Sequence, residues 1–494
     1  MTDTIKADLC IIGAGSAGLS IAAGAAQMGA KVVLIEAHKM GGDCLNTGCV
    51  PSKALLAAAK VAKVATASQR FGIDFGALNV DLMAVNGHVH RVIDGIAPHD
   101  SVERFEGLGC TVLQARAKFI DRQTVEAGAT RMGDPPLLGG AVMRQQKIRI
   151  IARRFVVATG SRAAVPPIPG LADVPYFTNE TIFDNTVLPE HLIVIGAGPI
   201  GCELAQAHRR LGARVTLLDA GPMMPKDDPD AVDVVRNRLV AEGIAVKERI
   251  KVLRVERGGA GVAVIIGGGH GEERLQGSHI LVAAGRKANV DNLGLEEAGV
   301  AYTQNGITVD ARLRSVSNSR VYAAGDVAGG LQFTHLAGYH AGIIIRNVLF
   351  RIPAKATPAA MPWVTFTDPE LAQVGLSEAE ARAKHGDTIK LLRAEFGSND
   401  RAQAELETEG FLKAIVDKSG RILGATIVGS HAGELILPWV LAISQRLRIG
   451  AMAGIIAPYP TLSEISKRAA GSYYTPGLFS DRTRAIVRFL GAFG

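Results

Sequence analysis

The clearest pattern of apolar and polar positions lies near the amino terminus, in the stretch ADLCIIGAGSAGLSIAAGAAQMGA (residues 7–30). It is almost wholly apolar, is interrupted by Gly13, Gly15 and Gly18, and has almost no basic residue before it. A membrane span needs about 20 mostly apolar residues without such breaks, and a signal peptide needs a basic start. The pattern therefore predicts a buried strand, a glycine turn and a helix.

The same pattern recurs in HLIVIGAGPIGCEL (residues 191–204). Each copy has a β-branched strand, the spacing G-x-G-x-x-G, an Ala-rich helix and a second strand that ends in an acid, Glu36 or Asp219. The glycines allow a tight turn and close approach of a pyrophosphate, the helix amino terminus faces the phosphates, and the acid accepts hydrogen bonds from a ribose. The glycines are Gly13, Gly15 and Gly18 in the first copy and Gly196, Gly198 and Gly201 in the second. Two ordered copies favour two dinucleotide sites over ordinary glycine turns, and they indicate electron transfer between two cofactors.

The acid of the second copy bears on the choice of nicotinamide cofactor. A carboxylate at Asp219 repels a 2′-phosphate, whereas NADP sites tend to place an arginine there. Arg214 and Lys226 lie near in the sequence. The pattern therefore favours NADH, with NADPH as the alternative.

Composition and charge narrow the class of protein. A chain of 494 residues is too long for one core and predicts about three or four domains. A net charge of +7 suits anionic small molecules, and no dense basic run with aromatics points to nucleic acid. Five cysteines make no disulfide scaffold, and no other stretch resembles a membrane span, so we expect a cytoplasmic, reducing compartment and no membrane contact.

Two of the five cysteines, Cys44 and Cys49, lie in GGDCLNTGCVPSKALL (residues 41–56). A zinc site needs about four ligands, and neither a second cysteine cluster nor a nearby histidine pair supplies them, so we expect no metal site. Two unrelated buried cysteines are the ordinary alternative. Pro51 and the helix-forming residues after it place both cysteines at or just before a helix amino terminus, which stabilises the reactive thiolate.

The spacing of the pair makes a further demand. Five residues of straight helix advance about 7.5 Å, beyond comfortable reach of a disulfide. Asn46 and Gly48 tolerate unusual backbone angles, so a bridge is feasible in a bent segment. A strained, accessible bridge of this kind would be reducible.

The motif G-G-x-C-L-N-x-G-C-x-P-S-K resembles the redox signature of the class I flavoprotein disulfide reductases, which include dihydrolipoamide dehydrogenase, glutathione reductase and mercuric reductase. VVATGS (156–161), LVAAGRKANVDNLGLE (281–296), VYAAGDVAGG (321–330) and PWVTFTDPELAQVGLSE (362–378) follow in the family's order. The resemblance implies an α/β chain with two Rossmann-like dinucleotide-binding domains, for FAD and NAD, and a C-terminal α+β dimerisation domain.

The implied domains are an FAD domain at 1–155 and 284–355, an NAD(P) domain at 156–283 and an interface domain at 356–494. Residues 128–147, rich in Gly and Pro, look like a loop extension of the FAD domain.

The resemblance also implies roles for individual residues. Cys44 would be the thiol that meets the substrate and Cys49 the thiol against the flavin, with Lys53 and Glu203 paired near the flavin N5. The FAD site would comprise Gly13, Gly15, Gly18, Glu36, Lys53, Ala117, Thr159, Gly160, Asp326, Gln332, Phe333, Thr334 and His335. The NAD(H) site would comprise Gly196, Gly198, Gly201, Glu203, Asp219 and Gly285. The plain alternatives are a solvated helix lysine for Lys53, a helix-start acid for Glu203 and a turn residue for Asp326.

The segment APYPTLSEI (residues 457–465) departs from the family. Thiol-exchanging members carry a His before the proline, oriented by a Glu, as an acid–base pair. Here Glu464 is present but Tyr459 takes the histidine position, and a hydroxyl with a reference pKa of about 10 is a poor proton shuttle near neutrality. A tyrosine here is similar to the mercuric reductase branch. That branch usually carries a cysteine pair near its carboxyl terminus to receive Hg(II), whereas in this sequence no cysteine follows Cys202. The alternative is that Tyr459 is an amphipathic packing residue at the dimer interface.

Three functional hypotheses follow. The first is a homodimeric NAD(P)H-dependent flavoenzyme with an active Cys44–Cys49 disulfide and a non-standard small-molecule acceptor, such as Hg(II) or a quinone. The second is a dihydrolipoamide dehydrogenase with Tyr459 in place of the usual His. The third is a flavoprotein kept as a binding or assembly component with vestigial turnover.

Overall fold

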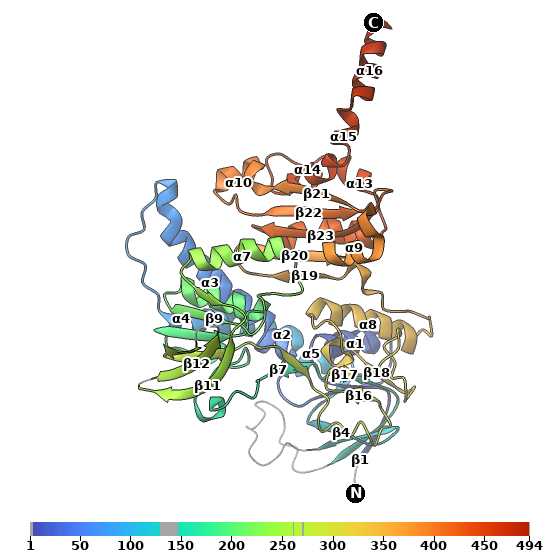
Figure 1. Ribbon diagram of the computed structural model, residues 1–494. Coiled ribbons are helices and arrows are strands. Elements are labelled where there is room, and N and C mark those ends of the chain that lie inside the picture. The colour runs from blue at the N-terminus through green and yellow to red at the C-terminus, as the bar shows by residue number, and fades with distance from the viewer. Residues whose placement is uncertain (1–2, 129–146, 260, 269–270, 494) are drawn as a thin grey trace. The chain divides into compact units, whose positions relative to one another are not determined.

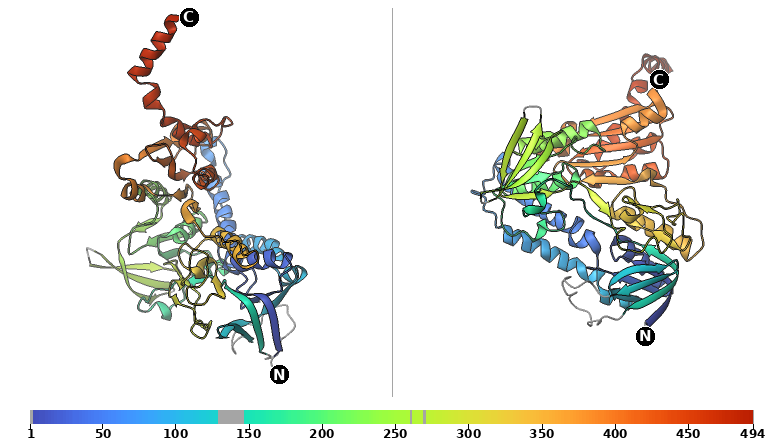
Figure 2. Two further views of the ribbon diagram at one scale, coloured as in Figure 1. Left: turned by 90° about the vertical axis from the view of Figure 1, so that its right-hand side faces the viewer. Right: turned by 60° about the horizontal axis from the view of Figure 1, so that its bottom comes forward.

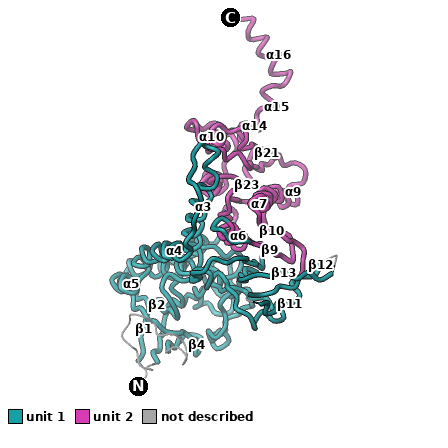
Figure 3. Tube along the Cα trace, turned by 90° about the vertical axis from the view of Figure 1, so that its left-hand side faces the viewer, with its two compact units in different colours: residues 1–196, 210–214, 252–357 teal, residues 197–209, 215–251, 358–494 magenta. Residues whose placement is uncertain are grey.

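The computed structural model describes residues 3–128, 147–259, 261–268 and 271–493, which are drawn in colour in Figures 1 and 2. The chain divides into two compact units (Figure 3). Unit 1 comprises residues 1–196, 210–214 and 252–357, and unit 2 comprises residues 197–209, 215–251 and 358–494. The predicted loop extension at 128–147 falls almost entirely outside the described residues.

A seven-stranded sheet forms the centre of unit 1. Its strands run in the order β3-β2-β1-β6-β5-β4, and β18 pairs with β6. Their bounds are β1 Asp3–Ile12, β2 Val32–Glu36, β3 Cys110–Gln114, β4 Arg116–Asp121, β5 Thr124–Gly128, β6 Ile148–Val157 and β18 Val321–Ala323. The pairs among β3, β2, β1, β6 and β18 are parallel, and β5 and β4 add an antiparallel edge. The ends of β1 and β6 are apolar and buried, as expected of parallel strands covered on both faces.

Helices α1 (Ser16–Gln27) and α8 (Thr334–Val348) lie side by side in unit 1 (Figure 1). Their small and apolar side chains, such as Ile21 and Ile344, share one core with one face of β1, which contributes Leu9 and Ile11. The other helices of this unit are α2 Gly42–Asn46, α3 Cys49–Ala67, α4 Leu82–Ile96 and α5 Val102–Gly107. This packing brings the first glycine turn and the start of α8 to the same end of the sheet.

Smaller ladders complete unit 1. Strands β8 (His191–Ile195) and β14 (His279–Val282) pair in parallel, and β7 (Ser161–Ala163) pairs antiparallel with β15 (Arg286–Ala288). The remaining strands are β11 Lys251–Gly258, β12 Gly261–Gly268, β13 Gly271–Gly277, β16 Tyr302–Thr303 and β17 Gly306–Ile307. The β7–β15 ladder sets Ser161 opposite Ala288 and Ala163 opposite Arg286, so Ser161 and Arg286 lie on neighbouring strands.

Unit 2 contains the part of the second glycine turn that follows Gly196, and a five-stranded antiparallel sheet. After α6 (Pro199–Arg210), strands β9 (Arg214–Leu218) and β10 (Ala245–Lys247) pair in parallel and α7 (Pro229–Ala241) joins them. The sheet has the order β19-β20-β23-β22-β21, with bounds β19 Pro362–Thr365, β20 Glu370–Gly375, β21 Lys390–Glu395, β22 Phe411–Val416 and β23 Ile422–Gly429. One face of the sheet packs on helices around the fully buried Trp439.

The helices of the carboxyl-terminal part are α9 Glu378–His385, α10 Asp400–Glu405, α11 Ala432–Leu435, α12 Leu437–Ser444, α13 Ile449–Ala453, α14 Glu464–Ser472, α15 Thr475–Leu478 and α16 Asp481–Leu490. Helix α16 extends away from the rest of unit 2 and has no buried residue (Figures 1 and 2). Within the described part of the chain, no helix is both long and apolar enough to cross a membrane. The predicted fold class is confirmed, while the predicted domain boundaries stay predictions.

Candidate active site

The two glycine turns are built in the same way. Gly13 has φ +105°, and a Cβ there would lie 2.4 Å from the carbonyl oxygen of Ala158. Gly196 has φ +112°, and a Cβ there would lie 2.3 Å from the carbonyl oxygen of Ala283. Both distances are far below contact, and both φ values suit only glycine. The first glycine of each motif is therefore required by the turn and also by the backbone that follows the neighbouring strand, β6 or β14.

The acids that end the second strands also have matching environments. In Glu36, Oε2 accepts from the amide of Ala14 (2.6 Å), and Oε1 accepts from the amide two residues further along the chain (2.8 Å). In Asp219, Oδ2 accepts from the amide of Ala197 (2.6 Å), and Oδ1 accepts from the amide two residues further along (2.7 Å). Each carboxylate is thus held beside its own glycine turn, where a ribose would be bound.

The segment that carries the cysteines begins directly against the first glycine turn. A Cβ at Gly42 would lie 2.7 Å from the Cα of Gly15. Any larger residue at Gly42 would therefore fill the space beside the turn. Backbone this bare suits a pyrophosphate, which must come close to main-chain amides. The first turn thus fits a dinucleotide, as the sequence predicts.

The two cysteines lie on either side of a break between helices. Helix α2 ends at Asn46, Thr47 and Gly48 intervene, and Cys49 is the first residue of α3. The side-chain amide of Asn46 donates to the carbonyl oxygen of Gly42 (2.8 Å), which holds the bend. The predicted bent segment is present, and α3 extends the predicted helix as far as Ala67.

The two thiols differ in their electrostatics. A hydrogen bond from Cys44 lowers the pKa of Cys49 to about 6, with help from Thr334 and Lys53. The same hydrogen bond, together with burial, raises the pKa of Cys44. The Sγ of Cys49 also lies 3.4 Å from Oγ1 of Thr334. In the dithiol form, Cys49 therefore carries the thiolate and Cys44 the proton. Cys44 is half-buried and Cys49 exposed in the single chain.

An ionic network that the sequence motifs do not reveal joins the redox segment to Asp326. The guanidinium of Arg286 lies 3.1 Å from Oδ2 of Asp43, the residue before Cys44, and 3.9 Å from Oδ2 of Asp326. Its Nε donates to the hydroxyl of Ser161 (2.7 Å), which in turn donates to Asp326. Burial raises the pKa of Asp326. Arg286 thus links the acid predicted for the flavin ribityl chain to the cysteine segment.

The segment QFTH leads into α8. Thr334 begins the helix, and the ring of His335 stacks on that of Phe333 with centroids 5.2 Å apart, while Gln332 precedes them in the loop. Thr159 and Gly160 both bond Asn289, through the Thr159 hydroxyl (2.7 Å) and the Gly160 carbonyl (3.0 Å).

Gly285 and Ala117 are also predicted to bind the cofactors. Gly285, with φ +121°, accepts from the amide of Ala164. Ala117 lies inside β4, opposite Ala127, and the residue that bonds the backbone of Glu36 is Ala115. The roles assigned to these residues stay predictions.

In unit 2, the structure places Glu203 on α6, where it is 5% exposed. Its Oε1 accepts a hydrogen bond from the backbone amide of Phe366 (2.9 Å). Gly198 has open space where its side chain would be, and Gly201 is buried in the first turn of the helix. The second turn therefore also leaves room for a ligand at its middle glycine.

Tyr459 has a partner that the sequence did not predict. Its hydroxyl donates to Oδ2 of Asp400 (3.0 Å), and this bond raises the pKa of the tyrosine. Glu464, the expected orienting acid, instead accepts a long bond from the amide of Thr461 (3.5 Å). The side chain of Tyr459 is 71% exposed in the single chain, so it is no core packing residue of its own subunit. No group of three acidic, His or Cys side chains among the described residues is arranged to hold a metal.

Known proteins resemble this chain over nearly its whole length. Residues 7–341 match the family model for pyridine nucleotide-disulphide oxidoreductases, and residues 361–470 match the dimerisation domain of the same family. The chain belongs to the pyridine nucleotide-disulphide oxidoreductase family. It is 33% identical over 465 residues to a mercuric reductase of Lysinibacillus sphaericus, covering 94% of this chain and 82% of the relative. It is 35% identical over 478 residues to that of Shigella flexneri, covering 94% and 80%.

Solved structures agree with this placement. LpdA from Mycobacterium tuberculosis matches with a TM-score of 0.84 and 26% identity, covering 96% of this chain and all of that one. The Cu(II) complex of RclA, an HOCl-induced flavoprotein disulfide reductase from Escherichia coli, matches with a TM-score of 0.82 and 26% identity, covering 95% and 99%.

Family membership settles the general chemistry. This oxidoreductase is a flavoprotein enzyme that uses FAD and NAD(P)H, and its dimerisation domain indicates a homodimer. The bare backbone at the first glycine turn, the carboxylate of Glu36 and the half-buried acid Asp326 fit FAD. The second turn with Asp219 fits a pyridine nucleotide.

Proposed function

We propose that this oxidoreductase passes electrons from NADH, through FAD and the Cys44–Cys49 pair, to a thiophilic metal ion such as Hg(II). The observation that carries the proposal is the hydrogen bond from Tyr459 to Asp400 at the position where thiol-exchanging members carry a histidine. The names of the relatives, mercuric reductase above all, support the same class of acceptor.

The proton balance explains why a metal ion suits this site. Exchange with a disulfide or dithiol substrate needs a group that takes and returns a proton as each thiol reacts. The bond to Asp400 raises the pKa of Tyr459 further above neutrality, so its hydroxyl serves this purpose poorly. A soft cation displaces the thiol proton itself, because the thiolate is the metal ligand and binding releases the proton. Cys44 then needs no separate base.

The residues of the chain divide the remaining work. Bound FAD supplies the acceptor for the hydride of NADH and the route for two electrons to the disulfide. Cys49 holds the thiolate charge with the help of Thr334 and Lys53, and Cys44 presents the protonated thiol to the acceptor. Over the cycle, NADH and Hg(II) give NAD⁺, one proton and Hg(0), with two electrons transferred. We place this reaction in the cytoplasm, which keeps thiols reduced and supplies the nucleotide.

Steady-state oxidation of NADH against a panel of acceptors tests the proposal. The panel contains Hg(II) buffered by excess small thiol, Cu(II), a soluble quinone and lipoamide. We expect the highest kcat/KM with a metal ion, and a loss of that activity by at least about 10²-fold in Cys44→Ser. Fast turnover with lipoamide would replace the proposal with a dihydrolipoamide dehydrogenase. Turnover with the quinone that survives Cys44→Ser would show a direct flavin route.

A further inference from the structure

The segment that follows Asp219 is tied down at both ends. We call residues 219–228 the donor loop, because it leaves the acid proposed to bind the pyridine nucleotide and runs to the start of α7. At its first end, Asp219 accepts from the amide of Ala197 (2.6 Å), and the amide of Met224 donates to the carbonyl oxygen of Ala197 (3.1 Å). Met224 is 1% exposed. The donor loop therefore lies directly on the second glycine turn.

At its other end, two consecutive acids of the donor loop bind the five-stranded sheet. Oδ1 of Asp227 accepts from the indole Nε1 of Trp363 (2.7 Å). Oδ2 of Asp228 lies 2.8 Å from Nζ of Lys413, and Asp228 is only 2% exposed. Only two residues separate Met224, which is bonded to the glycine turn, from Asp227. A displacement of the acids is therefore transmitted to the turn within one loop segment.

The partners on the sheet form a single row. Arg393, Lys413, Thr426, Gln373 and Trp363 are in register on the adjacent strands β21, β22, β23, β20 and β19. In-register residues of neighbouring strands point to the same face of a sheet. This face is opposite to the one that packs around Trp439, whose core includes the alternate residues of the same strands. One complete cross-strand row of the sheet thus faces the donor loop and α7.

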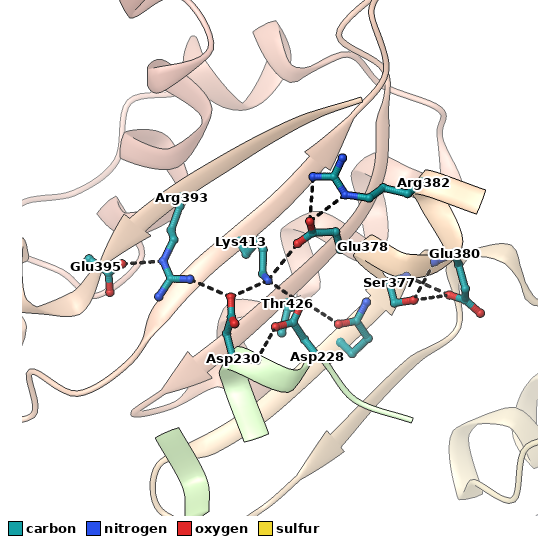
Figure 4. Close-up of polar contacts among 11 residues, drawn as sticks. Asp228, Asp230, Ser377, Glu378, Glu380, Arg382, Arg393, Glu395, Lys413 and Thr426 are labelled. Atoms are coloured by element: carbon teal, nitrogen blue, oxygen red, sulfur yellow. Dashed lines mark hydrogen bonds and ion pairs between the residues drawn. The ribbon is translucent and has the colours of Figure 1, made fainter. Parts of the chain in front are cut away.

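Lys413 is the member of this row around which the acidic side chains gather (Figure 4). Its Nζ lies 2.8 Å from Asp228, 2.9 Å from Asp230 and 3.3 Å from Glu378, with the side chain 6% exposed. Arg393 shares Asp230 at 3.2 Å. Within this cluster, Lys413 and Asp228 are the buried pair. Removing Lys413 is costly, because the charge of Asp228 then stays desolvated and loses this partner. Lys413 is therefore the residue whose loss would move the donor loop most.

We propose that Lys413, with Trp363, is a positioning residue for the pyridine nucleotide, and that the dimerisation-domain sheet sets the geometry of the donor site through the donor loop. The inference rests on the proposed assignment of Asp219 and its turn to the nucleotide. It predicts that these residues affect the binding of NADH more than the rate of hydride transfer, because they touch neither the flavin site nor the cysteine pair. Binding and transfer are separable measurements.

Anaerobic reduction of the bound flavin by NADH, followed by stopped flow, tests the inference without any acceptor. Lys413→Met should raise the apparent Kd for NADH by about three- to tenfold, and Trp363→Phe by about two- to fivefold, with limiting rates within about twofold. Lys413→Arg should restore near-normal binding, since it keeps the charge. The matched control is Arg238→Met. Arg238 is also on α7 but lies away from the donor loop, and the change breaks its 2.7 Å ion pair with Glu409, so the Kd for NADH should not change.

Each variant has a result that supports the inference and a result that overturns it. If Lys413→Met does not fold, Trp363→Phe decides alone, because it removes only the indole donor. Unchanged Kd in folded, FAD-loaded Lys413→Met and Trp363→Phe would overturn the inference, and so would an equal shift in Arg238→Met. Asp219→Ser, measured in parallel, separates a failure of the nucleotide-site assignment from a failure of the inference about Lys413 and Trp363. If Asp219→Ser leaves nucleotide binding unchanged, the assignment of the donor site itself fails; if it weakens binding while the row variants do not, only the inference fails.

Discussion

The sulfur of Cys49 lies 3.4 Å from the hydroxyl of Thr334, and each of these residues is the first of its helix, α3 and α8. Two helix amino termini therefore converge on one sulfur. The positive end of a helix dipole stabilises an anion, and a hydroxyl donor adds to this effect. The hydrogen bond from Cys44 lowers the pKa of Cys49 most, and the bond from Thr334 lowers it further.

Thr334→Val should raise the pKa of Cys49, because the thiolate loses a hydrogen-bond donor while the thiol loses little. We expect a rise of about 0.5–1 unit, which corresponds to about 0.7–1.4 kcal/mol. The thiolate forms as the pH rises through the pKa, so the curve of thiolate against pH should move toward higher pH. Titration of thiolate absorbance in the reduced enzyme measures it. Thr334→Ser keeps the donor and should behave as the unmutated enzyme, and equal shifts in both variants would assign the effect to packing.

The two cysteines should separate by their effect on the flavin spectrum. Two-electron reduction should produce a long-wavelength band from the Cys49 thiolate against the flavin. Cys49→Ser should abolish this band, whereas Cys44→Ser should show it already in the resting enzyme, because Cys49 is then never tied in a disulfide. Absorbance spectra under anaerobic titration decide between the roles. A band that survives in Cys49→Ser and vanishes in Cys44→Ser would reverse them.

The choice of donor should depend on Asp219. NADH should exceed NADPH in kcat/KM by at least about tenfold, because the carboxylate repels the 2′-phosphate. Asp219→Ser should narrow the gap by removing the charge. Steady-state kinetics with both donors measure it. Equal use of both by the unmutated enzyme would show that a nearby cation such as Lys226 outweighs the acid.

Tyr459→His should confer dihydrolipoamide turnover. An imidazole can shuttle a proton near neutrality, and a positioned base typically contributes about 10²–10⁴-fold. We expect an increase of at least about tenfold, with a new pH dependence near 6.5. Flavin reduction by NADH should not change, since that half-reaction does not use Tyr459. Rapid kinetics of the separate half-reactions check this. Fast dihydrolipoamide exchange in the unmutated protein would show that another residue already serves as the base.

The sequence was most informative where function depends on short stretches of backbone. The strand, the glycine spacing and the terminal acid lie within about 30 residues of each other, so their order predicts Gly13 with Glu36 and Gly196 with Asp219. The structure brings each acid to its turn as expected. The break between Cys44 and Cys49 was also predictable, because a straight helix would hold the two cysteines too far apart to form a disulfide.

Contacts between distant segments could not be predicted in this way. Arg286 contacts Asp43 although the two residues are far apart in the sequence. Tyr459 likewise bonds Asp400, which lies on a short helix well before it in the chain. The row that contains Lys413 depends on the register of five strands. Alternation of polar residues indicates which face a side chain is on, but it does not say which residues of neighbouring strands are paired. Such partners carry no local pattern, so they could not be predicted from the residues around them.

The bridges made by Glu36 and Asp219 have a consequence for redesign of the cofactor sites. Each carboxylate fastens the amide of its own turn with one oxygen and a later amide with the other. An exchange that removes the charge also unfastens the turn unless the new side chain keeps an acceptor. Asn at position 219 would keep the oxygen that holds Ala197 while discarding the repulsion, whereas a shorter alcohol has to reach further for the same bond. Selectivity and rigidity of the donor site therefore reside in the same two atoms and have to be engineered together.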